Sequence, residues 1–398
     1  MQRAIRGGPH FHAQAGPVRL CGPRKRKEES GVKEVRVVFT CQADFADLCL
    51  NELREAAPGA RLERWLAPGV GILSAPGDFP SLSRRFQAAR GEDGLEGKRL
   101  LFLRHIFPVD GCFALPDGGI EGCREAYGFL ADCARWMDRE RPFSVQARCL
   151  DPKPEGDTLH AVQYFFVDGL LGKGFRCDGA RPETVLSVVI AQGAVYLGLS
   201  SAQENLSAWP GGMRRFARRE DQISRAEFKL LEAIEAFSLP LPPVGWALDL
   251  GAAPGGWTKV LLEAGLRVTA VDPAALAPCL EQDPRVEHYR GLAQDFAREN
   301  RRAFDLLVND MRMDPAESAG IVCDLADCLA PGALAVMTFK LPSKKRTEQI
   351  RRGFSVLERR YRIRYARQLF HNRSEITVVC AKRDGVLPGS AGERAAFA

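Results

Sequence analysis

Trp246-Ala-Leu-Asp-Leu-Gly-Ala-Ala-Pro-Gly-Gly-Trp-Thr258 is the stretch from which the fold of this 398-residue chain can be argued. The apolar run 246–250, which ends at Gly251, predicts a buried strand of a parallel sheet. Residues 257–264 then follow helical spacing and stop before Gly265, which predicts a helix. The stretch therefore predicts the first strand, turn and helix of a βαβ unit.

The glycines of this turn predict a nucleotide site. Gly251, Gly255 and Gly256 allow a ligand to approach the backbone, and the helix N-terminus offers free N–H groups. A second apolar strand, 267–271, leads into Asp272, at the distance where a carboxylate bonds ribose hydroxyls. A dinucleotide fingerprint reads Gly-x-Gly-x-x-Gly, whereas here the spacing is Gly-x-x-x-Gly-Gly. That spacing favours S-adenosylmethionine, and a purely packing role of the glycines is the alternative.

Length and composition limit the class of protein. A content of 45% hydrophobic and 27% charged residues is typical of a soluble globular protein with two or three domains. No apolar segment approaches the roughly 20 residues that a membrane-spanning helix needs. The twelve cysteines include no Cys-x-x-Cys pair and the six histidines do not cluster. We therefore expect no metal site, and reduced thiols in a cytoplasmic protein.

Positive charge is concentrated in the segment 340–373, which holds twelve Lys or Arg against two Glu. A solvated helix face could carry such a run. Contacts between cations and phosphates, however, supply most of the nonspecific affinity of proteins for nucleic acids. We therefore predict a nucleic-acid partner, contacted by Arg214, Arg215, Lys344, Lys345 and Arg346.

The chain is predicted to divide into a basic leader (1–33), a small α+β domain (34–118), a second small α+β domain (119–212), the nucleotide-binding domain (213–382) and a tail (383–398). The leader is rich in Gly and Pro, so we expect it to be disordered. We interpret it as an over-extended start, with an organellar transit peptide as the alternative.

Further polar side chains are predicted at the carboxyl edge of the sheet, where open α/β folds place their active sites. The strand 304–308 leads to Asp310 and the strand 333–339 leads to Lys340. An acid and a lysine in these places suit the deprotonation of a hydroxyl, and Asp295 lies where it could read an adenine amino group. We predict that the cofactor is contacted by Gly251, Gly255, Gly256, Trp257, Asp272, Asp295 and Asp310.

The segment 224–382 resembles the FtsJ-like ribose 2′-O-methyltransferases, whose catalytic tetrad reads Lys-Asp-Lys-Glu. The matching residues are Lys229 in Ser-Arg-Ala-Glu-Phe-Lys, Asp310 in Asn-Asp-Met, Lys340 in Thr-Phe-Lys-Leu-Pro and Glu375 in Arg-Ser-Glu-Ile-Thr. The resemblance implies a Rossmann-like domain, S-adenosylmethionine as the methyl donor and Lys340 as the general base. It further implies that Lys229 is the like charge that lowers the pKa of Lys340, while the two acids orient the lysines.

Three motifs, 249–258, 340–346 and 366–375, look like the RlmM-type group, which methylates a cytidine 2′-hydroxyl in large-subunit ribosomal RNA. This resemblance implies a ferredoxin-like and a THUMP domain before the catalytic one, and ribosomal RNA as the partner of a cytoplasmic monomer. The alternatives are a nicotinamide-dependent oxidoreductase, methylation of another RNA nucleotide, and a noncatalytic RNA-binding assembly factor.

Overall fold

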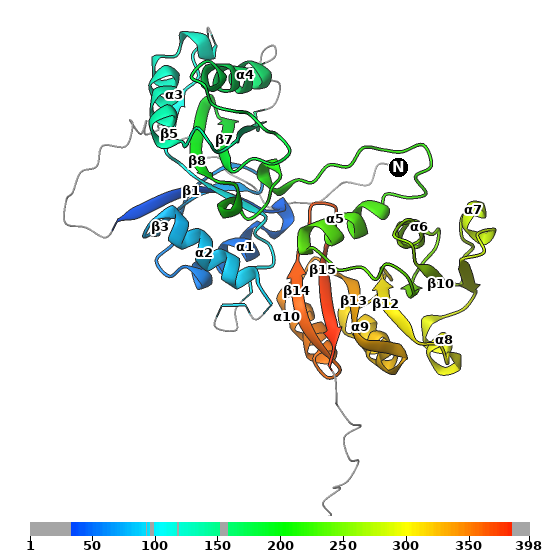
Figure 1. The fold of residues 1–398 in the computed structure, drawn as a ribbon. Coiled ribbons are helices and arrows are strands. Elements are labelled where there is room, and N and C mark those ends of the chain that lie inside the picture. The colour runs from blue at the N-terminus through cyan, green and yellow to red at the C-terminus, as the bar shows by residue number, and fades with distance from the viewer. Residues whose placement is uncertain (1–32, 93, 96–98, 118, 152–157, 384–398) are drawn as a thin grey trace, which may run out of the picture. The chain divides into compact units, whose positions relative to one another are not determined.

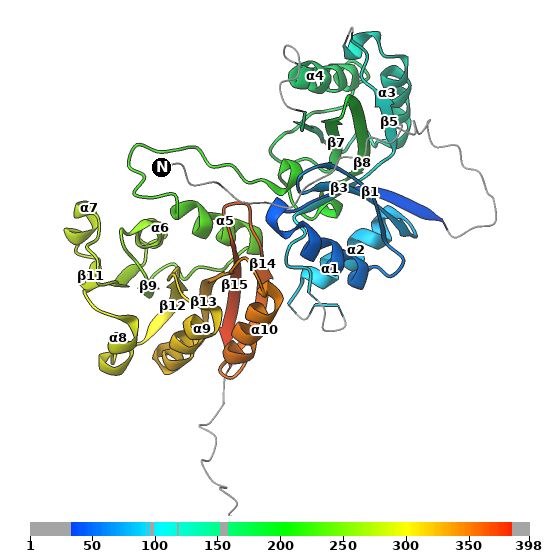
Figure 2. The same cartoon turned by 180° about the vertical axis from the view of Figure 1, so that it is seen from behind.

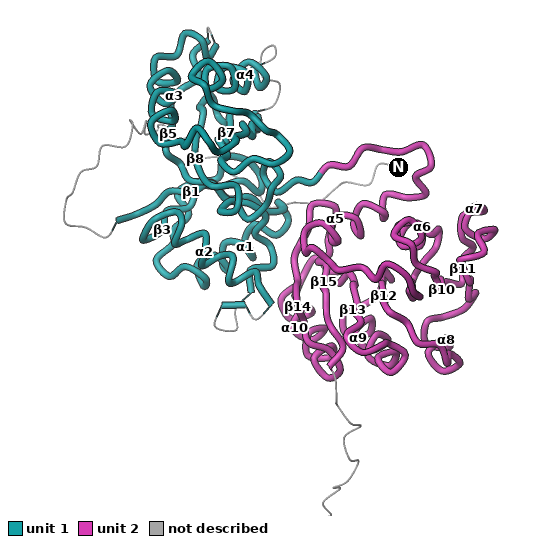
Figure 3. Tube along the Cα trace, in the orientation of Figure 1, with its two compact units in different colours: residues 1–214 teal, residues 215–398 magenta. Residues whose placement is uncertain are grey.

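The computed structural model describes residues 33–92, 94–95, 99–117, 119–151 and 158–383, and its chain trace is drawn in Figure 1. The chain divides into two compact units, residues 1–214 and 215–398 (Figure 3). Apart from Lys33 and Arg383, the predicted leader 1–33 and tail 383–398 lie outside the described residues.

The first unit begins with a four-stranded antiparallel sheet in the order β2-β3-β1-β4. Its elements are β1 (Glu34–Thr40), α1 (Ala46–Ala56), β2 (Arg61–Ala67), β3 (Val70–Pro76), α2 (Phe79–Arg90) and β4 (His105–Pro108). Residues 99–104, although largely apolar, form no strand before β4. The amides of Leu101 and Phe102 instead donate to the carboxylate of Glu52, at 2.9 and 3.1 Å.

A second sheet of this unit has the strand order β5-β8-β7-β6. It comprises β5 (Gly111–Ala114), α3 (Arg124–Trp136), β6 (Phe143–Cys149), α4 (Thr158–Leu171), β7 (Thr184–Ala191) and β8 (Ala194–Ser201). Strands β7 and β8 pair as an antiparallel hairpin. Gln192 and Gly193 both have positive φ, as a tight two-residue hairpin loop requires.

The second unit contains a seven-stranded sheet in the order β11-β10-β9-β12-β13-β15-β14. Its elements are α5 (Glu227–Phe237), β9 (Trp246–Leu250), α6 (Gly256–Glu263), β10 (Arg267–Val271), α7 (Pro278–Glu281), β11 (Val286–Tyr289), α8 (Ala293–Glu299), β12 (Phe304–Asn309), α9 (Pro315–Asp324), β13 (Leu329–Lys340), α10 (Arg346–Leu357), β14 (Tyr361–Arg367) and β15 (Glu375–Lys382). The strands are parallel except that β15 runs antiparallel to both β13 and β14.

Helices cover both faces of this sheet, as a doubly wound α/β domain requires. Helices α5 and α6 pack on each other over one face, while α8, α9 and α10 follow one another on the other face (Figures 1 and 2). The predicted βαβ unit is thus β9-α6-β10, and the Rossmann-like class of the domain is confirmed.

Ser224 and Glu227 have the spacing of a capping box but do not cap helix α5. Helix α5 begins at Glu227, and its N-cap, Ala226, provides no side-chain cap. The Glu227 carboxylate instead accepts from the amides of Ile223 and Ser224, at 2.7 and 3.0 Å. The two residues therefore stabilise the turn that precedes the helix.

Within the described ranges, every helix is too short or too polar to cross a lipid bilayer. The same ranges hold no group of three or more His, Cys, Asp or Glu side chains placed to bind a metal ion.

Candidate active site

The glycine-rich turn lies where the order of the sheet changes direction, which is where open α/β sheets bind their ligands. It follows β9, whose neighbours are β10 on one side and β12 on the other. Gly251 and Gly255 have φ of 74° and 111°, a backbone conformation that side chains rarely adopt. A Cβ atom on Gly255 would lie 2.0 Å from Leu280 Cδ1, and one on Gly256 would lie 2.3 Å from Ser224 Oγ. These two glycines therefore have a packing role in addition to any role at a ligand.

Three carboxylates, those of Asp249, Asp272 and Asp310, lie close enough to one another beside this turn for their charges to interact. Asp249 is fully buried, and Thr258 Oγ1 donates to its Oδ2 at 2.7 Å. Its Oδ1 has no hydrogen-bond partner among the described residues. Burial, followed by the charges of Asp310 and Asp272, raises the pKa of Asp249 to about 7. Asp272 accepts from the amides of Ala253 and Ala274, at 3.1 and 2.8 Å.

This set of donors and acceptors fits a cationic nucleoside ligand. An orphaned, buried carboxylate oxygen is costly unless a polar or positive group reaches it. A sulfonium cofactor brings such a charge, while the turn brings backbone amides and Asp272 a carboxylate for ribose hydroxyls. The residues present are therefore suited to S-adenosylmethionine.

Two other predicted cofactor residues occupy different surroundings. The indole of Trp257 is buried, and its Nε1 donates to the carbonyl of Ala226 at 2.8 Å. Trp257 can therefore offer a cofactor its backbone in the first turn of α6. Asp295 lies in α8 and forms an exposed ion pair with Arg298 at 3.1 Å. For both residues the contact with the cofactor remains a prediction.

The fold brings together the four residues matched to the tetrad. Lys340 Nζ lies 2.5 Å from Asp310 Oδ1 and 2.5 Å from Glu375 Oε2. Lys229 Nζ lies 3.2 Å from Asp310 Oδ2 and 2.6 Å from Glu375 Oε1. Each ammonium thus contacts both carboxylates, and the four charges alternate around a ring.

Each member of the ring is placed by a different element. Lys229 lies in the first turn of α5, Asp310 directly follows β12, Lys340 ends β13 and Glu375 begins β15. Strands β12, β13 and β15 are neighbours, and Lys340 pairs with Glu375 in the β13–β15 register. The side chain of Lys340 is the most exposed of the four, at 23%, whereas that of Glu375 is 6% exposed.

The two carboxylates of the ring dominate its electrostatics. Burial by itself lowers the pKa of Lys229, but Asp310 and Glu375 outweigh it and raise this pKa above its usual range. Burial likewise acts to raise the pKa of Asp310, yet Lys340 and Lys229 hold it below its usual value. The two carboxylates therefore balance the positive charge of the two lysines.

Two residues that sequence reasoning missed support the ring. Thr338 Oγ1 donates to Asp310 Oδ1 at 2.7 Å. Thr338 lies two residues before Lys340, on the same face of β13, so the period of a strand could have identified it. Glu232 lies one helical turn after Lys229, and its carboxylate accepts from the amides of Phe370 and His371 at 2.8 and 2.7 Å. It thereby fixes the loop that leads to Glu375.

The five predicted RNA-binding residues differ in their local surroundings. The guanidinium of Arg214 lies 5.5 Å from the centre of the Trp209 ring in the first unit, whereas Arg215 is exposed in the second. Lys344 and Lys345 are exposed between β13 and α10, close in sequence to Lys340. Arg346 donates through Nε to the carbonyl of Pro342 at 3.0 Å. Their contact with RNA remains a prediction.

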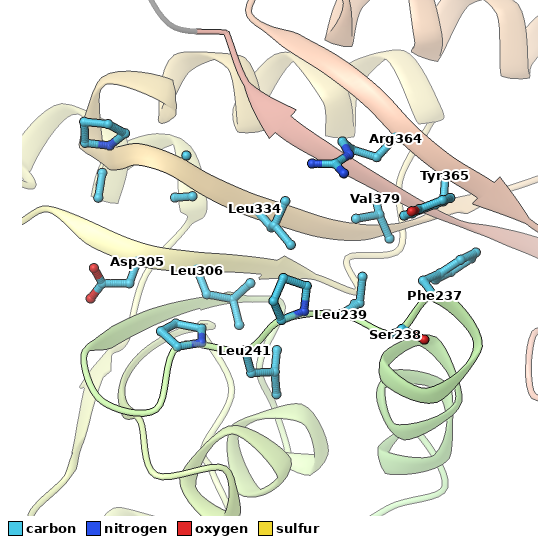
Figure 4. Close-up of a pocket in the computed structure, with 16 residues that line it drawn as sticks. Phe237, Ser238, Leu239, Leu241, Asp305, Leu306, Leu334, Arg364, Tyr365 and Val379 are labelled. Carbon is cyan, nitrogen blue, oxygen red and sulfur yellow. The ribbon is translucent and has the colours of Figure 1, made fainter. Parts of the chain in front are cut away.

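A pocket of about 500 Å³ lies at the other end of the strands, away from the ring (Figure 4). Figure 4 shows Leu306 and Leu334 on strands β12 and β13, between Asp305 and Arg364. Asp305 is near the start of β12, whereas Asp310 follows the end of that strand. None of the predicted cofactor or tetrad residues lines this pocket.

Comparison with known proteins agrees with this geometry. Residues 222–349 match the FtsJ-like methyltransferase family. The chain is 37% identical over 223 residues to the ribosomal RNA large subunit methyltransferase M of Azotobacter vinelandii. This alignment covers 52% of this chain and 61% of that protein. It is 38% identical over 222 residues to the protein of the same name from Methylococcus capsulatus, covering 52% and 60%. The chain thus spans about three fifths of the length of these relatives.

Among solved structures, the chain is similar to TrmN from Thermus thermophilus, at 17% sequence identity and a TM-score of 0.34. The alignment covers 88% of this chain and 100% of the TrmN chain. That likeness is too slight to carry a functional argument. The family match and the curated relatives confirm the FtsJ-like resemblance of the sequence.

Proposed function

We propose, from the membership of residues 222–349 in the FtsJ-like methyltransferase family, that this protein methylates the 2′-hydroxyl of a ribose in large-subunit ribosomal RNA. The observation that carries the proposal is the ring formed by Lys229, Asp310, Lys340 and Glu375. The ring lies at the carboxyl edge of the sheet, and Asp310 also contributes to the electrostatics of the glycine-rich turn.

The chemistry requires a proton acceptor beside an activated methyl group. Bound S-adenosylmethionine supplies the methyl on a positively charged sulfur. We assign Lys340 as the general base that accepts the ribose proton, since it is the most exposed member of the ring. Lys229 keeps its proton, because Asp310 and Glu375 raise its pKa. It can therefore hold the ribose oxygen and both carboxylates in place while Lys340 changes charge.

Asp310 connects the base to the cofactor site. It accepts from both lysines and from Thr338, and its charge also acts on Asp249 beside the turn. A cation bound beside Asp310 would share this carboxylate with Lys340 and so weaken the ion pair between Asp310 and Lys340. Binding of cofactor would in this way prepare the base for the ribose.

The substrate follows from the relatives and from the two small sheets of the first unit. The named relatives are methyltransferases of large-subunit ribosomal RNA, and a cytidine is the acceptor implied by the RlmM-type motifs. The first sheet has the βαββαβ order of a ferredoxin-like domain. We assign the second sheet, with α3 and α4, as the THUMP domain that binds RNA. Another RNA nucleotide as acceptor, or a noncatalytic assembly role, is the alternative.

Substitution of Lys340 tests the assignment of the base. Lys340→Ala should lower the rate of methyl transfer by about 10² to 10⁴, the usual contribution of a positioned base. Lys340→Arg should be equally impaired, because a guanidinium keeps the positive charge but does not give up its proton. Both variants should still bind S-adenosylmethionine, measured by calorimetry. Transfer at the wild-type rate by either variant would exclude Lys340 as the base.

A further inference from the structure

Three loops at the carboxyl edge of the sheet each carry an exposed cation close in sequence to a residue of the ring. Arg312 lies two residues after Asp310, Lys344 four residues after Lys340, and Arg373 two residues before Glu375. Within the described part of the chain, the side chains of Arg312, Lys344 and Arg373 form no ion pair or hydrogen bond, in contrast to Lys345, which lies 3.8 Å from Glu348. These three cations are therefore available to a ligand.

The order of the strands places the loops that carry these cations next to one another. Asp310, Lys340 and Glu375 belong to the ends of β12, β13 and β15, which are neighbours in that order. Adjacent strands are about 4.8 Å apart, so this part of the edge is about 10 Å wide. The loop of Arg312 lies at one end of it and the loop of Arg373 at the other.

The loops themselves are held by hydrogen bonds. The amide of Leu341 donates to the carbonyl of Ser374 at 2.8 Å, which joins the loop after β13 to the loop before β15. The amide of Leu369 donates to Asn372 Oδ1 at 2.8 Å. On the other side, the amide of Met311 donates to Asn309 Oδ1 at 3.0 Å. The long cationic side chains thus start from fixed backbone positions.

The fold separates these cations from others in the same basic segment. Arg359 is equally exposed, but it follows α10 and precedes β14, at the opposite end of the strands. Arg312 lies outside the segment 340–373 altogether, so the count of charges along the sequence did not reveal it. Position at the edge, rather than membership of the basic run, distinguishes the cations next to the ring.

We propose that Arg312 and Arg373, together with Lys344, bind the phosphates on either side of the nucleotide whose ribose lies at Lys340. This inference rests on the proposed function and names its substrate more narrowly, as one RNA strand that passes over the ring from β12 to β15. Arginine suits the task, since its planar fork can hold a phosphate by two parallel hydrogen bonds. The three cations flank the reacting ribose and leave the base to be recognised elsewhere.

The test compares Arg312→Ala, Arg373→Ala and the matched control Arg359→Ala in the full-length protein. With undermodified large-subunit ribosomal RNA, each of the first two variants should raise KM for RNA about tenfold while kcat is retained, since a charge-assisted contact is lost. The control should behave as the wild type, and Arg312→Lys should recover most of the loss. Unchanged KM in both variants, or an equal increase in the control, would overturn the proposal.

A second readout is the salt dependence of binding to a single-stranded oligoribonucleotide, followed by fluorescence anisotropy. Each loss of a phosphate contact should reduce the slope of log K against log salt by about 0.7. This readout is independent of methyl transfer. If the wild type transfers no methyl yet the slopes fall as expected, the proposed function is wrong but the phosphate contacts of these cations are supported. If transfer occurs and the slopes are unchanged, only the proposed phosphate contacts are wrong.

Discussion

Asp310 connects the lysine ring to the carboxylates beside the glycine-rich turn. It accepts from Lys229, Lys340 and Thr338, and it contributes to the raised pKa of Asp249. One carboxylate therefore belongs to two functional groups, the lysine ring and the cofactor turn. That sharing gives a physical reason for a cofactor charge at the turn to affect the ion pairs of the ring.

At the level of single residues, the raised pKa of Asp249 leads us to expect that binding of S-adenosylmethionine depends on pH. Its pKa of about 7 means that folded protein holds a proton there below pH 7, and a cationic ligand favours the carboxylate form. Binding should therefore release this proton at low pH, and affinity should fall by about tenfold between pH 8 and pH 6. Calorimetry at the two pH values measures the change.

Asp249→Asn supplies the control, because the amide oxygen can still accept from Thr258 but does not titrate. The variant should lose the part of the pH dependence that comes from Asp249. S-adenosylhomocysteine, which lacks the sulfonium charge, should show a weaker dependence than the methyl donor. Identical pH profiles for wild type and Asp249→Asn would contradict the role of this carboxyl.

The sequence alone predicted the four residues of the ring but not the residues that support them. Lys229, Asp310, Lys340 and Glu375 could be predicted because each falls in a motif at the start or end of an element. Thr338 and Glu232 could not be assigned in this way, because their contacts depend on which strands and loops become neighbours. The sequence likewise did not show that the pKa of Lys229 is raised, because this shift depends on the positions of Asp310 and Glu375 around the lysine.

At the scale of elements, the strands that alternate with helices in the second unit were largely predictable. The apolar runs at β9, β10, β12 and β13 are buried on both faces, and such runs are continuous in sequence. Strand β14 was not predicted, because it lies at the edge of the sheet and its sequence, Tyr-Arg-Ile-Arg-Tyr-Ala-Arg, alternates charge with apolar residues inside the basic segment. Edge strands commonly carry such charges.

A close approach between strands of the first unit gives a second prediction. A Cβ atom on Gly198 in β8 would lie 1.8 Å from the carbonyl oxygen of Pro108, the last residue of β4. Neither backbone can move aside cheaply, so Gly198→Ala should lower the free energy of unfolding by about 1–3 kcal/mol. Hydrogen exchange of the β8 amides, measured in the full-length chain, should become faster.

Gly128 provides the matched control for this substitution. It lies inside α3, is exposed, and a Cβ atom there would meet open space. Gly128→Ala should therefore stabilise α3 by up to about 1 kcal/mol, because alanine favours the helix. Unaltered exchange in Gly198→Ala, or equal effects of the two substitutions, would show that the strands can separate more easily than their contact implies.

At the scale of the whole molecule, the cofactor and tetrad residues all belong to the second unit. We expect residues 215–398, expressed alone, to bind S-adenosylmethionine with about the affinity of the full chain. We also expect a higher KM for RNA and a shallower salt dependence of RNA binding, since the sheet that we assign to RNA binding is removed. Equal KM values for the fragment and the full chain would contradict an RNA-binding role of the first unit.

The measurement that tests the central claim most directly is transfer of labelled methyl from S-adenosylmethionine to undermodified large-subunit ribosomal RNA. The RNA is then digested, and its nucleosides are identified by mass spectrometry. The account predicts 2′-O-methylcytidine from the wild type and its loss in Lys340→Ala. A methyl group on a base, or no transfer to RNA by a protein that binds the cofactor, would contradict ribose methylation by the Lys229-Asp310-Lys340-Glu375 ring.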